Sequence, residues 1–217
     1  MALAITDTKP HLRGWIHLAA FPTAIIAGLI LIATTPTLTG RLATAVYIAT
    51  SAALFGISAL YHRTNLSERA TTRLKRLDHA NIYLIIAGTY TPIAALALDG
   101  TARTALLTAI WTGALAGVAF RTLWLSAPRW LSTALYIALG WAAVFVMPQL
   151  LAGAGTTATA LIITGGVLYT AGGVIYALKR PNPSVQWFGF HEVFHAFTVA
   201  AYAAQFTAVA LVIHAAH

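Results

Sequence analysis

Long apolar runs separated by short polar segments dominate the chain. Runs near the length needed to cross about 30 Å of hydrocarbon fall at roughly 15–34, 42–61, 79–98, 104–121, 130–150, 158–178 and 190–213. The segments between them are rich in charged residues, glycine or proline, and one contains Pro181-Asn182-Pro183, which cannot continue a helix. The pattern predicts an all-α polytopic membrane protein, in which residues 1–217 form a single bundle of seven transmembrane helices.

Composition excludes a water-soluble globule. Of 217 residues, 59% are hydrophobic and only 8% are charged, so the charged side chains cannot cover the surface of a folded domain. Residues 1–10 are polar, and the apolar run that follows Trp15 is too long for the hydrophobic region of a signal peptide. We therefore expect no cleavable signal, and a first transmembrane helix in its place.

Cations are distributed unequally when seven spans are threaded through a bilayer. Eleven fall on the side of the N-terminus: Lys9, Arg13, Arg63, Arg69, Arg73, Lys75, Arg76, Arg121, Arg129, Lys179 and Arg180. Only Arg41 and Arg103 fall on the other side. Because cytoplasmic loops carry the excess of Lys and Arg, this predicts a cytoplasmic N-terminus and an outside C-terminus in a cell membrane. The net charge of +8 thus reflects cations in the cytoplasmic loops of a membrane protein. It does not indicate nucleic-acid binding, and no nucleic-acid partner is expected.

The strongest local motif is His191-Glu192-Val193-Phe194-His195. Two His four apart on a helix lie about 40° apart and one turn above each other, so both can reach one metal ion. The chain has no cysteine, so any metal must sit on nitrogen or oxygen ligands. The alternative is that the two imidazoles pack separately or reach the interface independently.

Topology adds further polar groups to this motif. In the seven-span arrangement, His62 ends the second helix and Asp78 opens the third, both at the cytoplasmic depth of His191 and His195. Three imidazoles and one carboxylate at one depth predict a His-rich zinc site with a position left for water. Taken singly, His62 can be explained as a histidine at the membrane interface, and Asp78 as a carboxylate that stabilises the start of a helix.

Other polar residues compete for roles. His17 matches the depth of a third ligand, and Ser58 could orient a ligand or water, or bond back to its own helix. Glu192 occupies the general-base position of a zincin-like His-Glu-x-x-His motif, where Asp78 is a rival. His79 points about 100° away from Asp78, and His214 and His217 lie about 30 Å away across the bilayer.

Together these residues resemble the bacterial hemolysin III family, which is related to progestin and adiponectin receptors and, more distantly, to alkaline ceramidases. The matching motifs are Ser58-Ala59-Leu60-Tyr61-His62, Leu77-Asp78-His79-Ala80-Asn81-Ile82-Tyr83, Ala87-Gly88-Thr89-Tyr90-Thr91-Pro92 and the His191–His195 motif. The resemblance implies zinc held by His62, His191 and His195. It also implies that Asp78 contacts the metal-bound water and that Ser58 lies just outside the ligand sphere.

Three functions follow as hypotheses. The leading one is a zinc-dependent hydrolase of a lipid amide or ester at the cytoplasmic leaflet, with Asp78 and Ser58 as catalytic residues and a membrane lipid as substrate. The second is a lipid sensor or receptor whose zinc is structural. The third, a pore-forming haemolysin with cytolytic activity, rests on the family name alone. A retinal protein is excluded, because Lys9, Lys75 and Lys179 all lie in predicted loops.

Overall fold

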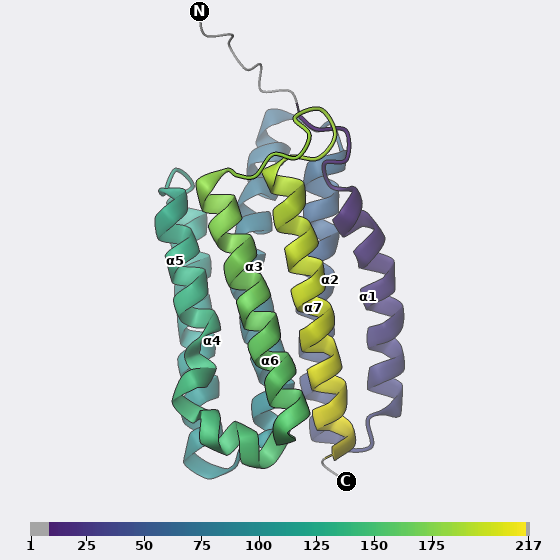
Figure 1. Cartoon of the computed structure of the whole chain (residues 1–217), viewed down its shortest axis with the longest axis vertical. Coiled ribbons are helices and arrows are strands. Elements are labelled where there is room, and N and C mark those ends of the chain that lie inside the picture. The colour runs from purple at the N-terminus through teal and green to yellow at the C-terminus, as the bar shows by residue number, and fades with distance from the viewer. Residues whose placement is uncertain (1–8, 216–217) are drawn as a thin grey trace, which may run out of the picture.

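A computed structural model describes residues 9–215 as an elongated helical bundle (Figure 1). Its elements are α1 (Trp15–Thr34), α2 (Leu38–Arg63), α3 (Glu68–Ala97), α4 (Gly100–Leu123), α5 (Arg129–Gly140), the 3-10 segment η1 (Ala142–Val146), α6 (Met147–Leu178) and α7 (Phe190–Ala215). The start of α1 and the end of α7 lie at opposite ends of the bundle (Figure 1). His217 and most of the polar N-terminal segment lie outside the described residues.

Apolar helices confirm the predicted all-α membrane protein. Within residues 9–215, six stretches are long and apolar enough to cross a membrane: α1, α2, α3, α4, residues 129–178 and α7. The difference from the predicted seven spans arises in residues 129–178, which form one stretch of 50 residues rather than two separate spans.

This stretch is interrupted twice, and the predicted helix over 130–150 does not form. α5 ends at Gly140 and is followed by the 3-10 turns of η1. The Tyr90 hydroxyl of α3 stabilises this break by donating to the Gly140 carbonyl (2.7 Å) and accepting from the Ala143 amide (2.8 Å). Inside α6, Gly155 adopts φ 78°, a left-handed conformation that glycine favours. Figure 1 shows α5 and α6 side by side, joined by a bend at one end of the bundle.

The basic segment 62–77, expected as a loop, is largely helical. α3 begins at Glu68, where the Ser67 hydroxyl caps the helix by accepting from the Ala70 amide (3.4 Å). α2 likewise starts at Leu38 rather than 42, because Thr37 caps the Gly40 amide (3.1 Å). Apolarity marks only the part of a helix inside hydrocarbon, so polar turns beyond it are missed.

α3 is the central helix, since it packs against α2, α4, α5, α6 and α7. Small residues permit this close packing. A Cβ atom on Gly117 of α4 would lie 2.3 Å from the Tyr83 ring of α3, so only glycine fits there. This packing fixes α3, and with it Asp78, among the helices that carry the histidines.

Candidate metal centre

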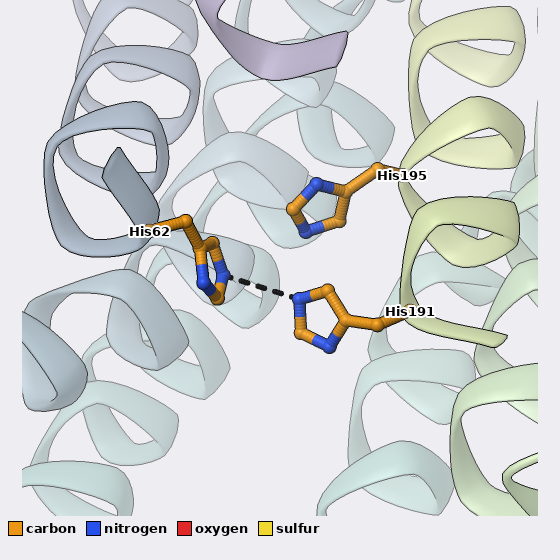
Figure 2. A group of neighbouring side chains, drawn as sticks. All are labelled: His62, His191 and His195. Atoms are coloured by element: carbon orange, nitrogen blue, oxygen red, sulfur yellow. Dashed lines mark hydrogen bonds between the residues drawn. The ribbon is translucent and has the colours of Figure 1, made fainter. Parts of the chain in front are cut away.

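Three histidines from two helices converge at one end of the bundle (Figure 2). His62 lies in the last turn of α2, and His191 and His195 lie in the first two turns of α7. Each offers a ring nitrogen within 4.8 Å of those of the other two. The Nε2 atoms of His62 and His191 are 3.1 Å apart, a contact marked by the dashed line in Figure 2. His62 and His195 are buried, and His191 is half-buried.

This arrangement fits a metal of the size of zinc. Two nitrogens bound tetrahedrally at about 2.0–2.1 Å from zinc lie roughly 3.3 Å apart. The Nε2 atoms of His62 and His191 lie 3.1 Å apart, and the ligand nitrogens of all three imidazoles lie within 4.8 Å of one another. Small side-chain rotations therefore suffice for three nitrogens to reach one ion, and a fourth position would remain open.

The loop before α7 fixes the position of His191. Ser184 and Phe188 exchange two backbone hydrogen bonds of 3.0 and 2.9 Å. The Asn182 side chain then accepts from the Phe190 amide (2.8 Å) at the first turn of α7. These contacts hold the start of α7 against the loop, so that His191 faces the end of α2.

Ser58 and Asp78 lie in the same cavity as His191 and His195. Ser58 is buried one turn before His62 on α2, and its hydroxyl is within interaction range of the Asp78 carboxyl on α3. The carboxyl also lies 3.7 Å from the His79 ring, whose Nδ1 contacts the Lys75 carbonyl (2.8 Å). The structure thus places both predicted catalytic residues beside the histidines.

Glu192 is fully buried, and both of its carboxylate oxygens are engaged. One forms an ion pair with Arg13, and the other accepts from the Gly189 amide (2.8 Å). A carboxylate at the third position of a helix that bonds back to the preceding backbone stabilises the helix start. Both carboxylate oxygens of Glu192 are therefore occupied, whereas the Asp78 carboxyl lines the cavity.

Residues 9–14 cover the histidines from the end of the bundle. Besides the Arg13 ion pair, the Lys9 ammonium donates to the His62 carbonyl, and the His11 amide donates to the Gln186 carbonyl (2.9 Å). Partial burial, together with the neighbouring Arg13 and Arg63, lowers the pKa of Lys9. In the sequence, Lys9 and Arg13 are recognisable only as topology signals, and no local pattern predicts these contacts.

His17 lies beside the trio rather than in it. Its ring is buried on α1 and stacks on the His195 ring, with centroids 3.7 Å apart. The converging nitrogens belong to His62, His191 and His195, so the structure does not bring His17 in as a third ligand. His214 lies in the last turn of α7, about 28 Å along the helix from His195 at 1.5 Å per residue.

A cavity of about 140 Å³ extends from His191 and His195 into the bundle. Its lining reaches from His191 to Gln205, a distance of about 21 Å along α7. Apolar side chains such as Ile82, Ile86 and Phe194 form much of the wall. The cavity wall is therefore largely apolar, with Asp78, His191 and His195 at one end and Gln205 at the other.

Arg121, the last residue of the predicted span 104–121, lines the same cavity, although the sequence identified it only as a cytoplasmic cation. It is 4% exposed at the end of α4, its Nη1 donates to the Ser132 hydroxyl (3.2 Å), and its Nε has no partner among the described residues. None of the ion pairs of residues 9–215 includes it. Its position inside the last turn of an apolar span was the available signal, because buried cations at membrane depth are costly and usually functional.

Fold and site define a polytopic membrane protein that buries a histidine cluster at one end of its helices. The family model described as "Haemolysin-III related" matches residues 5–206, and the chain belongs to this family, as its motifs predicted. It is 32% identical over 163 residues to the "Hemolysin-3 homolog" of Bacillus subtilis (strain 168), covering 72% of this chain and 74% of that protein. It is also 32% identical over 133 residues to the "Hemolysin-3" of Bacillus cereus, covering 61% of this chain and 58% of the relative.

Proposed function

We propose that the chain crosses a cell membrane seven times, with the N-terminus and the histidine cluster on the cytoplasmic side. The bend between η1 and the later part of α6 supports two separate crossings within residues 129–178. The 11 cations assigned to the cytoplasmic side, against two outside, support the orientation.

The three histidines hold zinc in this proposal. A zinc ion bound there would lower the pKa of a coordinated water toward about 7 and polarise a carbonyl oxygen. Imidazole nitrogens are preferred zinc ligands, and three of them with an open fourth position are typical of catalytic rather than structural sites. The choice of His62 over His17 rests on the convergence of its nitrogen with those of α7.

The reaction is hydrolysis of a lipid amide or ester. Asp78 accepts a proton from the attacking water, and returns it to the leaving amine or alkoxide as the carbonyl–heteroatom bond breaks. Ser58, within reach of the Asp78 carboxyl, orients it toward the histidines. Glu192 takes no part, since Arg13 and the Gly189 amide occupy its oxygens.

The cavity supports a lipid substrate. An acyl chain would lie along the apolar wall formed by residues such as Ile82 and Phe194, with its carbonyl at the histidine end. The buried Arg121 guanidinium lines the same cavity and would bind an electronegative atom of the head group. Such a substrate would reach the site from the inner leaflet.

One observation carries this proposal: His62, His191 and His195 converge, and His191 and His195 line one end of a largely apolar cavity together with Asp78. The test is hydrolysis of fluorescent N-acyl and O-acyl lipids in detergent micelles. We expect Asp78→Asn to retain zinc and lose turnover, and Glu192→Gln to retain both. Turnover by Asp78→Asn equal to wild type would contradict the assignment.

A second candidate is a lipid sensor with structural zinc. The trio joins α2 to α7, and this pair is not among the extensively packed helix pairs of residues 9–215. A metal there would fasten two helices that otherwise contact each other mainly through side chains. Zinc removal would then lower thermal stability strongly, with no lipid hydrolysis by the wild type. A pore, the third hypothesis, predicts planar-bilayer conductance that persists when His191 and His195 are both changed to Ala.

A further inference from the structure

One buried histidine next to the metal centre has no role in the proposed reaction. α1 buries only His17, Ala24, Gly28 and Leu31 among its twenty residues. His17 is 2% exposed, and neither of its ring nitrogens has a hydrogen-bond partner among the described residues. Because its nitrogens are buried without hydrogen bonds, which is unfavourable, any favourable contribution of His17 comes from the packing of its flat ring.

The His17 ring is held by two neighbours. It stacks on the His195 ring with an interplanar angle of 4° and a centroid distance of 3.7 Å. The Phe55 ring of α2 meets it edge-on at 5.2 Å and 74°. Together, the Phe55 and His195 contacts hold the His17 ring parallel to one face of the His195 ring.

The stacking geometry excludes His17 as a second ligand to an ion bound by His195. An imidazole nitrogen binds a metal through a lone pair in the plane of its own ring. Because the two rings are nearly parallel and stacked, an ion in the plane of His195 lies well outside the plane of His17. His17 can therefore influence the ion only through the His195 ring.

Metal-binding histidines usually have their ring orientation fixed by a hydrogen bond to the second ring nitrogen. The rings of His62 and His191 contact each other through their Nε2 atoms. The His195 ring, in contrast, forms no hydrogen bond among the described residues. The second torsion of a histidine side chain is broad and poorly restrained by itself. A flat ring on one face of His195 restrains that torsion.

We infer that His17 is a positioning residue, which holds the His195 imidazole in its metal-binding orientation by stacking. This inference rests on the proposed zinc site. Stacking requires a flat ring at position 17 but no ring nitrogen. Phenylalanine should therefore replace His17 in this role, whereas leucine, which has similar bulk but no ring, should not. Loss of partners that orient a metal ligand typically weakens metal binding by about 10-fold or more.

The experiment compares His17→Phe, His17→Leu and His17→Ala with wild type in full-length protein. Zinc affinity is measured by chelator competition, and ligand geometry by the visible absorption of the cobalt-substituted protein. We expect His17→Phe to keep zinc affinity within about 2-fold of wild type and to keep the cobalt spectrum. His17→Leu and His17→Ala should weaken zinc binding about 10-fold and alter the cobalt bands.

Phe21→Ala is the matched control, because it removes a ring from α1 that contacts Gly56 rather than the histidines. It should leave zinc affinity and the cobalt spectrum unchanged. Wild-type zinc affinity in both His17→Leu and His17→Ala would overturn the inference and leave the zinc site intact. Loss of zinc in His17→Phe would show that the nitrogen is required. A wild-type protein that binds neither zinc nor cobalt would overturn the inference together with the proposed function.

Discussion

Arg13, just before α1, forms an ion pair with Glu192, the fully buried carboxylate between the two histidines of α7. The two residues are 179 positions apart, so this pair connects the start of the chain to the last helix. Glu192 also accepts from the Gly189 amide. The N-terminal segment is thus a structural part of the histidine end of the bundle.

This ion pair predicts a stability effect separate from catalysis. Arg13→Ala leaves a buried carboxylate without its partner, which we expect to cost about 3 kcal/mol of unfolding free energy. Thermal unfolding in detergent measures the loss. Arg103→Ala, which breaks the exposed Arg103–Asp99 pair, is the matched control and should change stability little. Equal stability of Arg13→Ala and wild type would show that the pair contributes nothing.

The seven crossings and their orientation can be tested by labelling single cysteines, because the natural chain contains none. Thr156 lies at the bend within α6, and Arg69 and Lys179 lie at the histidine end. A membrane-impermeant maleimide added to intact cells should label Thr156→Cys and Arg103→Cys, and should not label Arg69→Cys or Lys179→Cys. Protection of Thr156→Cys alongside labelling of Arg103→Cys would rule out a separate crossing by α5.

Arg121 predicts opposite effects on the free and lipid-bound protein. Replacing a buried, unpaired cation by an apolar side chain often stabilises a protein, so Arg121→Met should raise the melting temperature without lipid by about 2 to 4 °C. The same variant should lose the further stabilisation that the N-acyl lipid gives to wild type. Arg41→Met, which removes a bond to the Thr35 carbonyl near the start of α2, is the control. Undiminished lipid stabilisation in Arg121→Met would remove Arg121 from the lipid site.

The sequence predicted features that depend on apolarity and local spacing. Apolar runs located the helices, and the four-residue spacing placed His191 and His195 on one face of α7. Threading the spans placed His62 and Asp78 at the same end, which the structure also does. The roles of these residues stay predictions, whereas membership of the hemolysin III family is confirmed.

Other features depend on contacts that no local pattern encodes. The polar first turns of α3 lie outside any apolar run, and the break at Gly140 depends on the Tyr90 hydroxyl from another helix. Stacking of His17 on His195 requires α1 to pack beside α7, which depth alone does not specify. Whether Arg121 faces the cavity or the solvent likewise depends on the rotation of α4.

The central claim is that His62, His191 and His195 bind one metal ion, and metal analysis of purified protein tests it most directly. We expect about one zinc per chain in wild type, and almost none in His62→Ala, because loss of one of three protein ligands abolishes tight binding. His214→Ala, at the other end of α7, should keep full zinc. Wild-type protein without zinc, or His62→Ala with a full complement, would contradict the account.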